Sequence, residues 1–251
     1  MEINEKLFTD IAIKAAKAAG QEILKIYNSA DLGVEYKADD SPLTKADLAA
    51  HKLICDFLSQ TNLPILSEEG KSIPYKERKM WEYFWMVDPL DGTKEFVKRN
   101  GEFTVNIALI HKGVPVMGVV YAPVLDWLFW GNSQGAWKIE GTKPMVTLQK
   151  KTRGAVNTIV ASRSHLSPET QEIIDQYPDA EVVSMGSSLK FMLLAEGKAQ
   201  LYPRFAPTME WDTAAAHGVL KALGYEIKKV SIDERLDYNK ENLLNPWFIA
   251  L

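Results

Sequence analysis

The motif DPLDGT, which begins at residue 88, combines side chains and backbone groups that could bind a divalent cation. The continuous apolar run Tyr83–Val87 predicts a fully buried strand that ends at Asp88, where a side chain can face a cleft. Pro89 lacks a backbone donor and should end the pairing of that strand. The carboxylates of Asp88 and Asp91, with the carbonyl of Leu90 between them, are hard oxygen ligands of the kind that Mg²⁺ prefers. An Asp-Pro strand end followed by an ordinary Asp-Gly turn is the structural alternative.

The end of the same motif is suited to holding an anion. Gly92 allows close backbone approach or a positive φ. Thr93 then begins a stretch, Lys94-Glu95-Phe96, that is compatible with a helical turn. Because backbone amides at such a start can bind phosphate, the motif offers an anion site beside its cation ligands.

Three further acidic positions have ordinary structural explanations when each is taken alone. Glu68, in Glu68-Glu69, follows a short apolar strand and would commonly be solvated surface. Asp212 lies at the start of a predicted helix, where capping and the helix dipole favour an acid. Asp47 lies inside a predicted helix, where a single acid usually faces solvent.

The first part of the chain predicts helices followed by antiparallel strands. Apolar residues recur at helical spacing over residues 3–28 and again over Thr44–Gln60. Strands with short Gly, Pro and Asn turns between them are expected at Glu102–Ile110, Val116–Tyr121, Leu125–Trp130 and Gly135–Ile139. Residues 1–148 are therefore expected to form an α+β half.

The second part alternates strands with helices, which indicates an α/β half over residues 149–251. We expect strands at Thr158–Ser162, Glu181–Ser184 and Gln200–Tyr202, and helices at Ser167–Tyr177, Ser188–Glu196 and Glu210–Leu223. The boundary falls in the polar and basic stretch Thr142–Arg153.

Composition excludes several classes of function. Twenty-nine basic and 33 acidic residues among 251 give a net charge of −4, which does not suit a sequence-independent nucleic-acid binder. The single cysteine, Cys55, cannot form an internal disulfide, so a reducing, cytoplasmic compartment fits, and we expect it to be packed and inert. No apolar run reaches the ~18 residues of a membrane span, and the polar N-terminus does not resemble a secretory signal.

Taken together and in order, the acidic motifs resemble the lithium-sensitive, magnesium-dependent phosphomonoesterase superfamily, which includes inositol monophosphatases, fructose bisphosphatases and 3′(2′),5′-bisphosphate nucleotidases. The segments that carry this resemblance are Ser67–Gly70, Trp85–Phe96 and Glu210–Ala215. Bacterial CysQ-type bisphosphate nucleotidases are the closer match, through Lys98–Ile110, Gly186–Phe205 and Met209–Leu220. The resemblance runs from Thr44 to Leu223 at least.

The resemblance implies a layered αβαβα sandwich with two or three Mg²⁺ ions between the halves. It implies that the first ion is held by Glu68, Asp88 and the Leu90 carbonyl, and the second by Asp88, Asp91 and Asp212. Glu68 would also help to hold a third, looser ion. The implied nucleophile is a water that Thr93 and Asp47 orient and deprotonate, and this role replaces the solvent-exposed interpretation of Asp47.

Substrate contacts are implied in the same way. The amides of Gly92 and Thr93 would hold the scissile phosphate. The turn Gly186-Ser187-Ser188 would hold a phosphate or a ribose hydroxyl, and Lys190 and Arg204 would bind a remote 5′-phosphate, with solvated surface charge as the alternative for both. Ser162–His165 would line the same cleft. His165 and His217 have no partner at metal-ligand spacing, so zinc binding is not expected.

The function that this resemblance implies is hydrolysis of adenosine 3′,5′-bisphosphate to AMP and phosphate, in sulfate assimilation and nucleotide turnover. An inositol or sugar phosphatase on the same fold is the alternative, because a fold does not choose its substrate. A catalytically silent sensor is disfavoured because no metal-ligand acid, Thr93 or Asp47 is missing. The oligomeric state and peripheral association with the cytoplasmic face of an inner membrane stay open.

Overall fold

A computed structural model of the chain describes residues 3–36, 42–151, 154–161, 167–232 and 234–251. Its centre is a seven-stranded sheet in the order β3-β4-β5-β6-β7-β8-β9, in which only β3 and β4 pair in parallel. The strands are β3 Ile65–Ser67, β4 Tyr83–Asp91, β5 Thr104–His111, β6 Val114–Ala122, β7 Trp127–Asn132, β8 Gly135–Glu140 and β9 Val146–Leu148.

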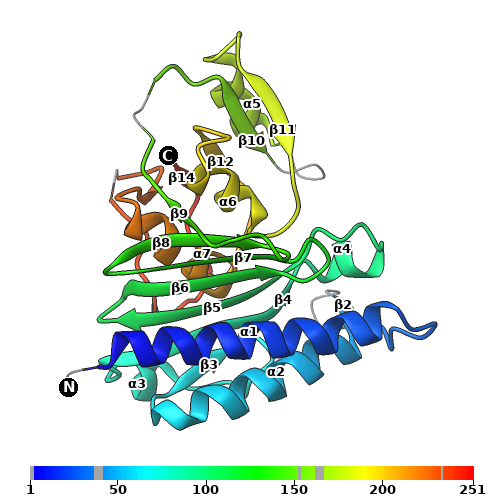
Figure 1. Cartoon of the computed structure of the whole chain (residues 1–251). Helices are drawn as coiled ribbons and strands as arrows, with labels where there is room; N and C mark the ends of the chain where they lie inside the picture. The colour runs from blue at the N-terminus through cyan, green and yellow to red at the C-terminus, as the bar shows by residue number, and fades with distance from the viewer. Residues whose placement is uncertain (1–2, 37–41, 152–153, 162–166, 233) are drawn as a thin grey trace.

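Two long helices cover one face of this sheet (Figure 1), α1 Glu5–Tyr27 and α2 Lys45–Leu58. Asn4 caps α1 by accepting from the Leu7 amide at 3.0 Å. Thr44 caps α2, and Asp47 completes a capping box by accepting from the Thr44 amide at 2.7 Å. The apolar side chains of both helices pack with β4–β6 into one of two cores. The short pair β1 Glu35–Tyr36 and β2 Pro42–Leu43 lies between the helices in the chain.

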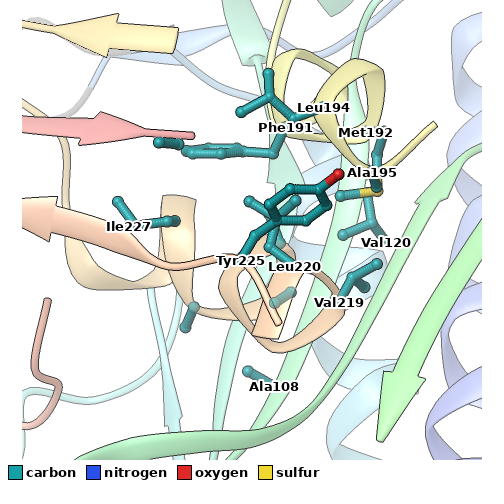
Figure 2. Close-up of a cluster of buried hydrophobic side chains, with 14 of the residues drawn as sticks. Ala108, Val120, Phe191, Met192, Leu194, Ala195, Val219, Leu220, Tyr225 and Ile227 are labelled. Carbon is teal, nitrogen blue, oxygen red and sulfur yellow. The ribbon is translucent and has the colours of Figure 1, made fainter. Parts of the chain in front are cut away.

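The opposite face carries the described residues from 154 to 251 (Figure 1). Its helices are α5 Pro168–Asp175, α6 Leu189–Ala195 and α7 Glu210–Ala222. Its strands are β10 Thr158–Ala161 with parallel β11 Glu181–Ser184, and a second sheet of β12 Tyr202–Arg204, β14 Phe248–Ala250 and β13 Ile227–Lys229. Side chains of α6 and α7 meet those of the central sheet in the second core, part of which Figure 2 shows.

Helix α7 lies directly on the backbone of the central sheet. A Cβ added to Gly118 of β6 would lie 1.9 Å from the Ala215 carbonyl oxygen, and one added to Gly131 of β7 would lie 2.8 Å from the Val219 Cα. Gly218 of α7 faces the Met117 and Gly118 backbone in the same way. These close approaches set the depth at which α7, and the Asp212 that it carries, rests on the sheet.

The layered αβαβα type of fold is confirmed, with differences at single elements. Strand β4 continues past Asp88: its pairing with β5 is interrupted and resumes at Asp91 opposite Thr104. Gln200–Tyr202 was expected to be a strand, but β12 begins at Tyr202. The patterns missed α3 Tyr75–Arg78, the 3₁₀ turn Ser59–Thr61, β9, β13 and β14. Each of these elements has only three or four residues, which is too short for a periodic signal.

No helix within the described residues is both long enough and apolar enough to cross a membrane. The division at residue 148 stays a prediction.

Candidate active site

Three carboxylates from the two parts of the chain converge where β4 ends and α7 begins. One oxygen from each of Asp88, Asp91 and Asp212 lies within 4.8 Å of the other two. Burial, with the charges of neighbouring acids, raises the pKa of Asp88 well above its usual range. Burial and the charge of Asp91 do the same for Asp212. A cation would relieve this repulsion, and an all-oxygen donor set suits Mg²⁺, so the residues fit the ion that the sequence implied.

Glu68 belongs to the same electrostatic cluster. It follows β3, and its amide donates to the Val87 carbonyl of β4 at 3.1 Å, which keeps the residue beside the end of that strand. Its charge contributes to the raised pKa values of both Asp88 and Asp212, after the larger effect of burial. The Asp88 carboxylate also accepts the Leu90 amide at 3.0 Å, which orders the turn that carries the Leu90 carbonyl.

Asp91 is oriented by donors from the turn before α6 and from β5. Its Oδ2 accepts the Ser188 amide at 2.8 Å and the Ser187 hydroxyl at 2.5 Å. The Asn106 side chain donates to the same oxygen at 3.3 Å. The Ser188 hydroxyl in turn donates to the Asp212 carbonyl at 2.9 Å. The turn before α6 therefore connects Asp91 at the end of β4 with Asp212 in α7.

The sequence analysis did not identify Asn106 and Thr104 as residues of the site. Both are buried within the otherwise apolar strand β5. Their spacing of two residues puts them on one face of the sheet, the face that meets Asp91 and the turn at 186–188. Two polar residues at alternate positions of an apolar strand were the available signal.

The turn Gly186-Ser187-Ser188 is committed to contacts within the protein. The Gly186 amide donates to Glu102 Oε2 at 2.9 Å, and a Cβ at Gly186 would lie 2.5 Å from the Glu102 carbonyl oxygen. Ser187 has a φ of 52°. Gly186 and Ser187 line the cavity described below, whereas Ser188 is buried among its partners. Direct substrate contact by this turn stays a prediction.

Thr93 and Asp47 meet as the resemblance implied. The Thr93 hydroxyl lies 3.1 Å from Asp47 Oδ1 and 3.3 Å from the Leu90 carbonyl. Asp47 is 2% exposed, so the solvent-facing interpretation of this helical acid was wrong. Burial is the main effect on its carboxyl and raises its pKa. Gly92 has a φ of 92°, as expected, and leads into the short helix α4 Thr93–Val97.

A cavity of about 450 Å³ opens beside Asp91 and Asp212. Lys190 and Arg204 both line it, together with Lys94 and Lys98, which the sequence reasoning did not single out. Lys190 is 7% exposed rather than solvated, and its ammonium donates to the carbonyls of Ser187 at 2.7 Å and Met185 at 3.1 Å.

Lys190 and Arg204, the two predicted ligands of the remote phosphate, are held in different surroundings. Burial lowers the pKa of Lys190 to about 8. The Arg204 guanidinium donates to the Pro207 carbonyl at 3.3 Å, and its Nε is buried without a hydrogen-bond partner in the described part of the chain. A buried unsatisfied donor beside a polar cavity is a candidate for contact with a ligand.

The remaining predicted positions lie apart from the cluster. His217 is fully buried and paired with Tyr238 and Glu226, so it is not a metal ligand here. Cys55 is half-buried on α2, and burial raises the pKa of its thiol. Ser162–His165 falls outside the described residues.

Residues 4–246 match the model of the inositol monophosphatase family. The chain belongs to this family. Within the family, it is 47% identical over 239 residues to a protein named 3′(2′),5′-bisphosphate nucleotidase CysQ from Salmonella typhimurium, which covers 93% of this chain and 95% of that one. It is 46% identical to the protein of the same name from Escherichia coli K12, over 95% of this chain and 97% of the other.

Solved structures agree with this family membership. The chain superposes on CysQ from Bacteroides thetaiotaomicron with a TM-score of 0.89 and 46% identity, covering 99% of this chain and 98% of that one. An inositol monophosphatase from Anabaena has a TM-score of 0.76 at 24% identity, over 99% of this chain and 91% of the other, and shares the fold. Members of this family are magnesium-dependent phosphatases.

Proposed function

We propose that this chain is a magnesium-dependent 3′(2′),5′-bisphosphate nucleotidase, which hydrolyses the 3′-phosphate of adenosine 3′,5′-bisphosphate to give AMP and phosphate. The observation that carries the proposal is the placement of Lys190 and Arg204 in the same cavity as Asp91 and Asp212. A substrate with two phosphates can place one at the carboxylate cluster and the other at these cations. The identity to CysQ proteins over more than nine tenths of both chains supports the same assignment.

The residues that would hold two or three Mg²⁺ ions are Glu68, Asp88, the Leu90 carbonyl, Asp91 and Asp212. When bound, the ions supply positive charge to the phosphoryl and departing oxygens and acidify the attacking water. The amides of Gly92 and Thr93 would orient the scissile phosphate in the same turn.

Thr93 and Asp47 have complementary parts in activating water. Because the Thr93 hydroxyl donates its proton toward Asp47, its lone pairs are free to accept a hydrogen bond from the water. The buried Asp47 carboxylate, whose pKa is raised, is the group that can take up the proton. The Thr44 amide and hydroxyl hold the other oxygen of Asp47, so the acceptor is fixed in direction.

Lys190 would bind the remote 5′-phosphate with the one ammonium N–H that does not donate to the preceding turn. An ammonium has three donors, and the Ser187 and Met185 carbonyls take two of them. Arg204 would supply the second contact. Remote binding energy of this kind can be used to position the reacting phosphate.

Other properties follow from the same assignment. We expect inhibition by Li⁺ and by Ca²⁺, since Ca²⁺ is larger and tolerates irregular coordination that Mg²⁺ does not. We also infer a role in sulfate assimilation. We infer a cytoplasmic location, and peripheral contact with the cytoplasmic face of a membrane is compatible with it.

The test measures phosphate release from adenosine 3′,5′-bisphosphate, 3′-AMP and inositol 1-phosphate with Mg²⁺. We expect the bisphosphate to have the highest kcat/KM. Arg204→Ala should lower kcat/KM for the bisphosphate about 10- to 100-fold, the value of one charge-assisted contact, and change 3′-AMP little. Arg235→Ala, an exposed arginine outside the cavity, is the matched control. Equal kcat/KM for inositol 1-phosphate and the bisphosphate would overturn the assignment in favour of an inositol or sugar phosphatase.

A further inference from the structure

Two buried charged side chains lie outside the cavity, on either side of one C-terminal segment, residues 237–245. Arg78 is the last residue of α3 and is 3% exposed, and Glu210 is the first residue of α7 and is fully buried. Neither lines the cavity. Buried charges seldom add net stability compared with apolar residues of similar size, so their presence calls for another explanation.

Arg78 binds the segment from the side of the first half. Its guanidinium donates to the Asn239 side chain at 2.8 Å, to the Lys240 carbonyl at 2.6 Å and to the Glu241 carbonyl at 2.8 Å. The Asn239 side chain donates back to the Arg78 carbonyl at 2.7 Å. The planar fork of arginine makes these contacts together, which a lysine ammonium cannot reproduce.

Glu210 binds the same residues from the side of α7. Its carboxylate accepts the Asn239 amide at 2.5 Å, the Lys240 amide at 3.0 Å and the Lys240 ammonium at 2.5 Å. Residues 239 and 240 are therefore held between Arg78 and Glu210. We call this arrangement the Arg78–Glu210 clamp.

The rest of the segment is also attached both to the first half and to the start of α7. The Tyr238 amide donates to the Gly113 carbonyl in the turn between β5 and β6 at 3.1 Å. The Asn245 side chain donates to the Met209 carbonyl at 2.8 Å, directly before α7. The segment thus links the central sheet to the first turn of α7.

Asp212 lies in that first turn, two residues after Glu210, and its carboxylate accepts the Met209 amide at 2.8 Å. Repulsion from Asp88 and Asp91 acts on Asp212 whenever no cation is bound, and it pushes the start of α7 away from β4. The clamp ties the first turn of α7, through residues 239–241, to Arg78 of the first half and so opposes this displacement.

We propose that Arg78 and Glu210 are positioning residues for the metal centre, which hold the first turn of α7 so that Asp212 stays within reach of the ion shared with Asp88 and Asp91. The proposal rests on the metal centre described under the proposed function. It adds two residues that touch neither substrate nor metal and act through Asp212.

The test compares the wild-type protein with Arg78→Met, Arg78→Lys and Glu210→Gln. Binding of Mn²⁺ is measured directly by electron paramagnetic resonance, and the Tm is measured in EDTA. We expect each variant to bind Mn²⁺ about 10- to 100-fold more weakly, the range found for residues that orient metal ligands. Arg78→Lys should not restore binding, because the fork is lost. The double variant Arg78→Met/Glu210→Gln should lose less than the sum of the two single losses, because both act through the same segment.

Lys229→Met is the matched control, since it breaks the ion pair of Lys229 with Asp237 at 2.6 Å at the start of the same segment. It should lower the Tm and leave Mn²⁺ affinity unchanged. Unchanged Mn²⁺ affinity in Glu210→Gln and Arg78→Lys, with a lower Tm only, would show a purely structural role and overturn the proposal. These two variants also decide the question if Arg78→Met does not fold. Absence of Mn²⁺ binding by the wild-type protein would instead overturn the metal centre itself.

Discussion

The water-activating role that we propose for Thr93 and Asp47 depends on the surroundings of these two side chains. A threonine hydroxyl is a weak acid and a weak base in water. Here it points at a carboxylate that is 2% exposed and whose pKa burial raises. Such a pair can polarise a water molecule where neither residue alone could.

Thr93→Ala should therefore lower kcat about 10²- to 10⁴-fold, the usual contribution of a positioned proton acceptor, with little change in KM. Thr93→Ser keeps the hydroxyl and should retain most of the activity. Steady-state phosphate release measures both, after circular dichroism has shown native folding. A near-normal kcat in Thr93→Ala would remove this residue from the mechanism.

Lys190 predicts a pH dependence. Burial lowers its pKa to about 8, so the charged form is lost as the pH rises through that value. If the ammonium binds the remote phosphate, kcat/KM for adenosine 3′,5′-bisphosphate should fall above pH 8, while kcat/KM for 3′-AMP should not fall on this account. Lys190→Met should abolish the difference between the two profiles. The same decline with both substrates would assign the titration to another group.

At the scale of elements, the contact between α7 and the central sheet decides where Asp212 lies. Gly118, Gly131 and Gly218 let the helix approach the backbone of β6 and β7 more closely than any side chain would allow. A helix held at ordinary packing distance would carry its first turn away from the end of β4. The glycines therefore act on the proposed metal centre indirectly, because they set where Asp212 lies.

Gly118→Ala should lower the free energy of unfolding by about 1–3 kcal/mol, because the new Cβ would overlap the Ala215 carbonyl oxygen and force α7 outward. Urea denaturation measures this change. Gly154→Ala is the control, since nothing lies within 4 Å of its Cβ position, and should stay within about 0.5 kcal/mol. Equal stability of the two variants would mean that α7 can shift without strain.

At the scale of the whole molecule, the carboxylate cluster brings together residues from both parts of the chain, and its carboxylates repel one another. Since the pKa of Asp88 is raised well above its usual range, its charged form destabilises the metal-free fold. The sign of the linkage is that this destabilisation is present above the folded pKa and is relieved as the pH falls through it. A bound cation relieves it at neutral pH.

Magnesium should therefore raise the Tm, by about 5–10 °C at a concentration of about 100 Kd, from about 2.7 kcal/mol of binding linkage and about 2–4 °C per kcal/mol at this chain length. Asp88→Asn should raise the Tm measured in EDTA and abolish the increase with Mg²⁺. Thermal unfolding followed by circular dichroism tests both effects. An Asp88→Asn protein that still gains the full Mg²⁺-dependent shift would contradict the assigned ligand.

Local sequence was enough to predict the long helices, the buried strand before Asp88 and the glycine turn at Gly92, because apolar periodicity and backbone sterics act over a few residues. The acidic motifs, through their resemblance to known phosphatases, also pointed to a family that the comparisons confirm. Propensity alone misplaced Asp47, since a helical acid is exposed unless tertiary packing buries it.

The tertiary structure alone decided which distant groups meet. Asp47, Glu68, Asp88 and Asp212 are separated by many residues, and only the stacking of helices on a shared sheet brings their charges together. The polar Asn106 in an apolar strand was a local signal of an unusual position, but it did not show which groups the side chain would meet. The clamp formed by Arg78 and Glu210 has no local signal, because these residues acquire their partners only when the chain folds. The sequence by itself determined the chemical groups and the local turns that present them, whereas their convergence is a property of long-range packing, which local periodicity does not encode.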